Sequence, residues 1–439
     1  MTNLKTDGSS KKKVLITSIV FMGLSHILYF KQYVKGVLYA LIELVTLVMM
    51  PVIIRKITEL ITLGYPQPEL PVKMRSNSIF MLIDGVMLLA LLACILAVYI
   101  ISVKSALREY RLYCATGSVN AKSKSVKHIV ADSFRLWGMA PTILLVVFLV
   151  IVPLVFSACV AFTDYSSPDH IPPNNTVNWV GFKNFVTMFG GNAAWTSAFA
   201  RVALWTLVWG VLATVTCYFG GMIMAVVLTQ NKVRLRPVFQ SIFILPYAVP
   251  AVLTMLIWRN LLNGSFGTVN RTLMQLGIID TAIPWLSDPT FAKFTCVLVN
   301  LWAGFSYFML LTTGTMTSIS EDIYEAAAID GATKPQIFRH IILPLVLYQT
   351  MPLIIMSFTH NINNFGAIYF LTMGDPAVAD STITSAGGTD ILVTWIYNLT
   401  TKLSKYNYAS VIAVIIFIVL TPFAIWQFSR TKSYKDGEL

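Results

Sequence analysis

Two apolar runs of the sequence carry polar and small residues at positions i, i+3, i+4 and i+7, the spacing that places side chains on one face of a helix. The first set is Asn300, Ala303, Gly304 and Tyr307, and the second is Ser357, His360, Asn361 and Asn364. Amides and hydroxyls at the mid-depth of a bilayer need partners. We expect these faces either to hydrogen-bond across packed helices or to line a pocket for a polar ligand. A sugar suits such a pocket, because its hydroxyls pair with amides and its apolar face lies on aromatic rings.

A second segment, residues 320–344, interrupts the apolar runs with charged and turn-forming residues. Ser320 is a candidate helix cap, and acidic residues follow it at the positive end of the predicted helix. Gly331 ends that helix, and Pro335 starts a second short one. The pattern predicts a water-exposed elbow between two membrane spans.

Several kinds of catalytic site have no motif in this sequence. It contains neither a Gly-x-x-x-x-Gly-Lys-Ser/Thr phosphate loop nor a His-Glu-x-x-His motif, so we expect no ATPase activity, no metal and no cofactor of its own. The later spans hold no Asp or Glu at mid-depth. Glu43 and Asp84 lie in early spans, where we expect structural hydrogen bonds, with ion coupling as the alternative. Energy for transport would then come from a partner, whereas a proton-coupled carrier is the rival hypothesis.

The composition predicts an all-α integral membrane protein. Of the 439 residues, 56% are hydrophobic and 12% are charged, and the mean hydropathy is +0.70. At about 20 residues per crossing, eight spans are predicted, at 36–54, 79–103, 138–162, 202–229, 238–262, 291–317, 345–371 and 409–429.

Basic residues give the predicted orientation. The net charge of +12 is concentrated between and after spans, which favours a membrane surface over nucleic acid. The clusters are Lys104, Arg108, Arg111, Lys122, Lys124, Lys127 and Arg135; Lys232, Arg234 and Arg236; and Arg430, Lys432 and Lys435. Eight spans place all three clusters, the elbow and the C-terminus in the cytoplasm.

The shorter apolar stretch at 14–30 is ambiguous. Lys11 to Lys13 precede it, and Lys31 and Lys35 follow it. If both groups are cytoplasmic, the stretch dips into the membrane and returns, or lies along the interface. The alternative is a ninth crossing, with the N-terminus outside.

The elbow resembles the coupling loop of ATP-binding-cassette importer permeases. The matching residues are Glu325, Ala326, Ala327, Asp330, Gly331, Ala332, Phe338, Ile341, Leu343 and Pro344. Further stretches resemble the larger membrane subunit of maltose and maltodextrin importers: Ala161 to Ser166, Val180 to Phe185, Ile244 to Pro250, Asn263 to Gly267, Trp285 to Pro289 and Thr389 to Val393. The resemblance implies a type I importer permease core of six spans at 136–439, with coupling helices at 320–344. Residues 1–135 would form an N-terminal membrane extension with two spans and a basic linker.

The resemblance also implies partners and site residues. The partners are a second homologous permease, two copies of an ATPase that binds the ATP, and an extracellular or periplasmic sugar-binding protein, in a bacterial cell membrane. The substrate implied is a maltose- or maltodextrin-type oligosaccharide, with another sugar as the alternative. The family's sugar contacts correspond to Ala251, Asn300, Ala303, Gly304, Tyr307, Ser357, His360 and Asn361. At three of these the family pattern differs: it has serine at 251, leucine at 303 and phenylalanine at 360.

Overall fold

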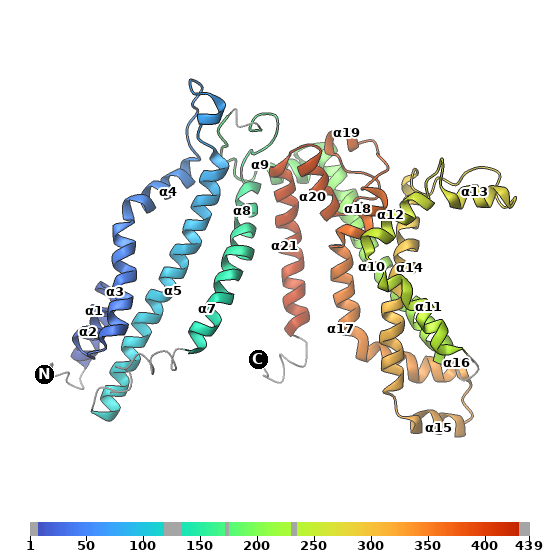
Figure 1. The fold of residues 1–439 in the computed structure, drawn as a ribbon, viewed down its shortest axis with the longest axis horizontal. Coiled ribbons are helices and arrows are strands. Elements are labelled where there is room, and N and C mark those ends of the chain that lie inside the picture. Colours follow the sequence, from blue (N-terminus) through green and yellow to red (C-terminus); the bar gives the residue numbers. More distant parts are fainter. Residues whose placement is uncertain (1–7, 118–133, 172–174, 230–234, 430–439) are drawn as a thin grey trace. The chain divides into compact units, whose positions relative to one another are not determined.

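The described part of the chain is built from helices, together with one isolated β-bridge between Thr163 and Trp179. The computed structural model describes residues 8–117, 134–171, 175–229 and 235–429 (Figure 1). By packing, the chain divides into two compact units, Met1–Trp179 and Val180–Leu439. The helices at 134–161, which the sequence predicts to belong almost entirely to the core at 136–439, fall in the first unit.

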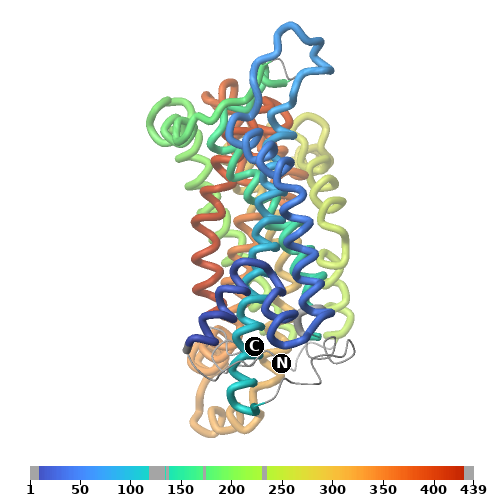
Figure 2. The backbone as a smooth tube through the Cα atoms, turned by 90° about the vertical axis from the view of Figure 1, so that its left-hand side faces the viewer, coloured from blue at the N-terminus to red at the C-terminus, as the bar shows by residue number. Residues whose placement is uncertain are grey.

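Unit 1 contains an N-terminal helical hairpin followed by longer apolar helices. Its helices are α1 (Gly8–Val20), α2 (Leu24–Leu28), α3 (Tyr33–Val48), α4 (Met50–Thr62), a 3₁₀ turn (Val72–Met74), α5 (Ser78–Thr116), α7 (Phe134–Val146) and α8 (Val152–Ala161). A π-helical turn at Val147–Ile151 joins the last two. Figure 2 shows α1 and α2 beside the lower half of α5.

The stretch at 14–30 forms α1 and α2, helices of 13 and 5 residues. At 1.5 Å per residue, α1 is only about 20 Å long, too short for a hydrocarbon core of about 30 Å. The chain reverses at Gly23, whose φ of +81° suits glycine. This geometry agrees with a stretch that dips in and returns, and it disfavours a ninth crossing.

The hairpin is held to the rest of unit 1 by hydrogen bonds. The hydroxyl of Tyr99 donates to the carbonyl of Ile19 at 2.6 Å, and His26 Nε2 lies 3.2 Å from the Ser105 hydroxyl. His26 is fully buried at this contact.

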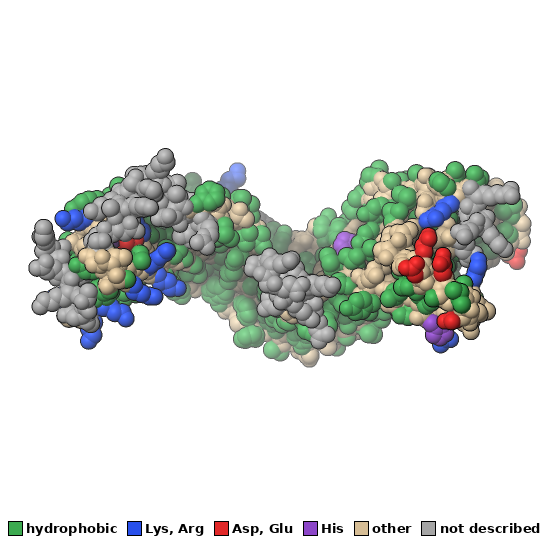
Figure 3. All heavy atoms as spheres, turned by 90° about the horizontal axis from the view of Figure 1, so that it is seen from below, with side chains coloured by type: hydrophobic (Ala, Val, Ile, Leu, Met, Phe, Trp, Pro, Cys, Tyr) green, Lys and Arg blue, Asp and Glu red, His purple; other side chains and the backbone are tan. Residues whose placement is uncertain are grey.

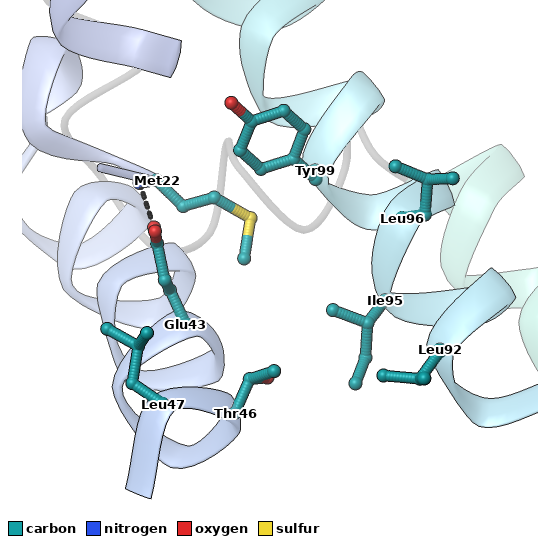
Figure 4. A pocket seen from close by; sticks show the side chains of 8 residues that line it. All are labelled: Met22, Glu43, Thr46, Leu47, Leu92, Ile95, Leu96 and Tyr99. Carbon is teal, nitrogen blue, oxygen red and sulfur yellow. Dashed lines mark hydrogen bonds between the residues drawn. The ribbon is translucent and has the colours of Figure 1, made fainter. Parts of the chain in front are cut away.

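Both acidic residues of the early spans have partners within unit 1. The carboxylate of Glu43 accepts a hydrogen bond from the backbone N–H of Met22 beside a pocket of about 300 Å³ (Figure 4). Asp84 Oδ2 lies 2.8 Å from Lys56 Nζ, which also pairs with Glu59. These contacts favour structural roles over ion coupling.

Unit 2 contains the later spans and the connections at their ends. Its helices are α9 (Lys183–Val186), α10 (Ala193–Thr229), α11 (Arg236–Ala248), α12 (Ala251–Leu261), α13 (Thr268–Gln275), α14 (Pro289–Thr317), α15 (Glu321–Ile329), α16 (Lys334–Ile337), α17 (Leu343–Ile362), α18 (Phe365–Thr372), α19 (Ser381–Thr384), α20 (Leu392–Thr401) and α21 (Tyr406–Ser429). π-Helical turns at Thr187–Gly191 and Phe338–Ile342 join α9 to α10 and α16 to α17. Helices α10, α12, α14 and α18 share one buried cluster that includes Trp209, Met255, Val299 and Ile368.

Six of the eight predicted spans overlap single long helices of the described residues, and the spans predicted at 36–54 and 238–262 overlap bent helix pairs. Six helices are long and apolar enough to cross a membrane, and two bent pairs, α3 with α4 and α11 with α12, bring the number to eight if each pair is one span. The second pair bends by 91°. Val249, which precedes Pro250, is extended at the bend, as the residue before a proline prefers.

The run at 345–371, expected as one continuous span, is broken. Helix α17 ends at Ile362 and α18 begins at Phe365. The side chain of Asn364 accepts a hydrogen bond from the N–H of Ala367 at 3.2 Å and thereby caps α18. Asparagine at such a position favours a new helix start over continuation of the old helix.

Candidate functional site

The elbow at 320–344 forms the predicted pair of helices at one end of unit 2 (Figure 1). Helix α15 ends in a Schellman motif: the N–H of Gly331 donates to the carbonyl of Ala328, and the N–H of Ala332 donates to that of Ala327. Gly331 has φ +75°, and a β-carbon built there meets no atom within 4 Å. Glycine is needed at this position for its backbone conformation and not for lack of space.

The starts of the two elbow helices are fixed differently. Ser320 occupies the N-cap position of α15, but its hydroxyl donates to the Asp322 carboxylate at 3.1 Å and makes no cap bond to the backbone. At α16, Gln336 Oε1 accepts from both the N–H and the hydroxyl of Thr333, each at 2.8 Å. Pro335 lies in the first turn of α16, as predicted.

The elbow presents an outer face to solvent. Glu325, Ala326, Asp330, Gly331 and Pro344 are exposed. Ile329, at the end of α15, is 85% exposed. Figure 3 shows acidic side chains gathered on this end of unit 2, with basic side chains beside them. An acidic surface with a protruding isoleucine is suited to contact with a partner.

The inner face of the elbow packs against the long helices. Tyr324, Phe338 and Leu343 contact a cluster whose buried members include Ile342 and Phe308. Ala327 is buried, whereas Ala332 and Ile341 are half-buried. Partial burial raises the pKa of Tyr324. The same cluster contains Cys217 of α10, so packed side chains connect the elbow to the middle of the unit.

The polar face of α14 divides between two environments. Asn300 is buried, and its Nδ2 donates to Cys217 Sγ of α10 at 3.3 Å. Gly304 lies against the same thiol, since a β-carbon there would come within 2.7 Å of the sulfur. Ala303 is half-buried against the cluster of Trp209 and Val299. Tyr307 is exposed, with its ring 6.1 Å from that of Tyr247 on α11.

The polar face of α17 is also divided. Asn361 is buried, and its Nδ2 donates to the Thr214 hydroxyl of α10 at 3.0 Å. Its backbone carbonyl accepts a hydrogen bond from Trp209 Nε1, also at 3.0 Å. Ser357 is half-buried and His360 is exposed. The neighbouring Asn364 caps α18.

Two of the residues predicted to contact the sugar lie at helix breaks, whereas those of α14 lie within a continuous helix. Asn361 is one residue from the end of α17, and Ala251 is the exposed first residue of α12, directly after the 91° bend. Interrupted helices at membrane depth are a recurring feature of transporter binding sites, because unwound backbone leaves hydrogen-bonding groups for a ligand. Asn300 and Asn361 both reach α10, at residues only three positions apart.

Sequence reasoning missed two sets of residues. The first is Thr214 and Cys217, which are short and unremarkable side chains within an apolar run. The second is a network at the other end of unit 2, which we call the outer cap (residues 372–398). In it the buried carboxylate of Asp390 accepts from the Gly387 N–H and the Thr394 hydroxyl, each at 2.7 Å, and from Asn398 Nδ2.

Arg201 of α10 completes the outer cap from a distant part of the sequence. Its guanidinium donates to the Gly387 carbonyl at 2.7 Å and pairs with the Asp380 carboxylate at 2.5 Å. The one signal for this cap in the sequence was the stretch from Thr389 to Val393, which carries family resemblance without a stated role.

Comparisons with known proteins agree with this architecture. Residues 217–428 match the family described as "binding-protein-dependent transport system inner membrane component". The chain is 35% identical to the galactooligosaccharides transport system permease protein GanP of Bacillus subtilis, over 93% of this chain and 95% of that protein. It is 33% identical to the maltodextrin transport system permease protein MdxF of the same organism, over 98% of both chains.

A solved structure shares the fold. It is a bacterial ABC transporter involved in the import of the acidic polysaccharide alginate, with a TM-score of 0.54 and 22% identity. The match covers 69% of this chain and 98% of that one.

Proposed function

We propose the following role in transport for this chain, which belongs to the binding-protein-dependent permeases of ATP-binding-cassette sugar importers. As a member of this family it is a multi-pass subunit of the bacterial cell membrane and not a catalytic ATPase. The chain pairs with a second, homologous permease to enclose a path for a neutral oligosaccharide. A binding protein delivers the sugar from outside. Two ATPase subunits bind the ATP and close against the elbows, so that the path opens alternately outward and inward.

The observation that carries this proposal is the packed connection between the elbow and the polar faces. Phe338 and Tyr324 of the elbow contact the cluster that contains Phe308 and Cys217. Cys217 in turn accepts a hydrogen bond from Asn300. Close-packed side chains transmit displacement. A partner that moves the outer face of α15 therefore moves the neighbourhood of Asn300.

The orientation follows from charge. The elbow and the start of α11, with Arg236, lie at one end of unit 2, and α21 also ends there (Figure 1). In unit 1, the C-terminal end of α5, with Lys104, Arg108 and Arg111, lies at the same end as the N-terminal hairpin. The remaining residues of the three basic clusters lie outside the described side chains. Lys11 to Lys13, Lys31 and Lys35, which flank the stretch at 14–30, are described. By the positive-inside rule these ends and the C-terminus are cytoplasmic.

For the substrate we propose a maltodextrin-type oligosaccharide bound by Asn300, Asn361, Tyr307, His360 and Ser357, with Ala251, Ala303 and Gly304 shaping the space. Amides and a phenol suit hydroxyls and a sugar's apolar face. Galacto-oligosaccharide is the second candidate, because a relative with that name is 35% identical over nearly the whole chain.

Uptake competition distinguishes the two sugars. In vesicles from the source cells, we expect labelled maltotriose to enter on ATP addition, and unlabelled maltotriose to compete better than a galactotriose. Stronger competition by galactotriose assigns the second candidate. Tyr307→Ala should lower uptake at least tenfold while the subunits still assemble, whereas Tyr348→Ala, at an 81% exposed site on α17, should not. Uptake by this chain alone under a proton gradient would contradict the proposal.

The coupling role is tested at Gly331. Gly331→Asp adds a side chain to the elbow in a left-handed conformation, and we expect uptake to fall below one tenth while insertion continues. Gly277→Asp is the matched control, because Gly277 (φ +66°) ends α13 in the same hydrogen-bonding motif with nothing within 4 Å of a built β-carbon. Its helix lies at the opposite end of unit 2 (Figure 1). Equal loss in both variants would indicate backbone strain and not lost coupling.

A further inference from the structure

The two amides assigned to the sugar are already occupied by side chains of α10. Asn361 Nδ2 donates to Thr214 Oγ1 at 3.0 Å, and Asn300 Nδ2 donates to Cys217 Sγ at 3.3 Å. Thr214 and Cys217 are 2% and 3% exposed and lie three residues apart, on one face of α10. Neither side chain was part of the polar faces read from the sequence, nor of the sites carried over from the family.

This occupation has a physical reason. A buried amide without a partner destabilises the protein by about 1–3 kcal/mol, and more so away from water. When no sugar is present, a neighbouring hydroxyl or thiol removes that penalty. Gly304 makes the thiol contact possible, because any β-carbon at 304 would collide with Cys217 Sγ.

The two contacts differ from another side-chain hydrogen bond between α10 and α17. Tyr218 and Thr350 form a buried hydroxyl pair at 2.9 Å, between α10 and the middle of α17. Asn361, in contrast, lies near the end of α17, next to the break at 363–364, and its side chain bonds to the single hydroxyl of Thr214. The thiol is a weak acceptor. Both amides are therefore held by bonds that a sugar hydroxyl can replace.

We propose, as an extension of the proposed function, that Thr214 and Cys217 set the affinity of the sugar site by competing with the substrate for Asn361 and Asn300. In the empty site α10 holds both amides. An arriving oligosaccharide exchanges its hydroxyls for the Thr214 hydroxyl and the Cys217 thiol, so that these two side-chain hydrogen bonds, one from α10 to α17 and one from α10 to α14, open as it binds. Sugar binding thereby loosens α10 from the two helices that flank the elbow.

The test compares ligand stabilisation in the full assembly, purified through a tag on this chain, with Thr214→Val. Valine keeps the shape of threonine and removes the competing acceptor. We expect the empty variant to melt at a lower temperature than the wild type, and maltotriose to raise its melting temperature by more than it raises that of the wild type. Its Kd for maltotriose, measured without the binding protein, should be about two- to tenfold lower, the equivalent of one net hydrogen bond.

Two controls and one substitute variant accompany this test. Thr229→Val should match the wild type, because the Thr229 hydroxyl bonds to the Ala225 carbonyl of its own helix. Thr214→Ser should also match it, since the hydroxyl is retained. Where Thr214→Val fails to assemble, Cys217→Ala provides the same comparison at Asn300.

An equal rise with maltotriose in Thr214→Val and wild type, at a lower starting temperature, would show that Thr214 only joins the helices, and would overturn the inference. A wild-type assembly that neither maltotriose nor a galactotriose stabilises would instead overturn the proposed sugar function, and this inference with it.

Discussion

The two ends of unit 2 differ in where their charged side chains lie, which is in the interior of the outer cap but on the surface of the elbow. The outer cap folds around its own buried polar groups: Asp390 is 1% exposed and accepts hydrogen bonds from the backbone and from two side chains, and Arg201 joins it from α10. The elbow has no comparable interior. Its helix α15 has nine residues, its acidic side chains are exposed, and its most exposed large apolar side chain, Ile329, lies at its end.

This difference indicates which end of unit 2 is stabilised by contacts within the chain and which end has a surface suited to a partner. A buried carboxylate that accepts several hydrogen bonds holds the segments that donate them in one arrangement. A short helix depends on packing for its stability, and an exposed apolar side chain at its tip is available for contact with a partner. The cap is therefore expected to depend on residues within this chain, and the elbow on contacts with another.

The largest effect on stability is expected in the cap. Asp390→Ala leaves the donors of Gly387, Thr394 and Asn398 without their acceptor, so we expect about 3 kcal/mol of destabilisation. Thermal unfolding of the purified protein, with proteolysis of residues 372–398, measures it. Asp375→Ala, at an exposed position of the same cap, is the control and should stay within about 0.5 kcal/mol. Equal stability of the two variants would mean that the network does not organise the cap.

An intermediate effect is expected in the elbow, on assembly and not on folding. Ile329→Ser removes an apolar side chain that is 85% exposed here, so the melting temperature of the isolated chain should not change. If an ATPase cleft buries this side chain, its loss weakens the association about tenfold. Co-purification at graded ATPase concentrations measures this. The matched change in the cap, Ile383→Ser at a 57% exposed site, should have no effect on either property.

The smallest effect is a pH dependence confined to the cap. Burial raises the pKa of Asp390 above that of a free carboxyl, despite opposing contributions from its hydrogen bonds to Gly387, Thr394 and Asn398 and from Lys402. As the pH rises past about 3.9, the unfolded chain releases this proton while the folded chain retains it. The stability from this group is thus fully present below the unfolded pKa and falls as the pH rises through the raised folded pKa.

Asp390→Asn lacks this titration. The stability difference between wild type and Asp390→Asn should therefore shrink between about pH 4 and the folded pKa, which melting curves across that range would detect. A difference that is constant with pH would contradict the shifted pKa.

Much of the architecture could be predicted from the sequence because membrane insertion imposes local rules. Apolar run lengths predicted the spans, and Gly331 and Pro335 predicted the elbow, since a left-handed helix end and a fixed φ are properties of single residues. The break after Ile362 was missed because an apolar window averages over polar residues. The run Asn361 to Asn364, with Ile362 between amides, contained a signal for it that hydropathy does not use.

The spacing of polar residues predicted which side chains of the candidate site share a helix face, but not what surrounds each of them. The i, i+3, i+4, i+7 pattern placed Asn300 and Tyr307 on one face, yet one is buried against α10 and the other is exposed beside Tyr247. Periodicity gives the direction of a side chain from its own helix and says nothing of what faces it.

The sequence by itself determined that this chain spans a membrane, has no phosphate loop of its own, and carries a charged elbow between two apolar runs. These properties follow from local composition and short motifs. Tertiary structure decided which groups meet: Thr214 with Asn361, Cys217 with Asn300, and Arg201 with a loop more than 170 residues later. Such pairs depend on how separate helices pack, and no local preference of the chain encodes that packing.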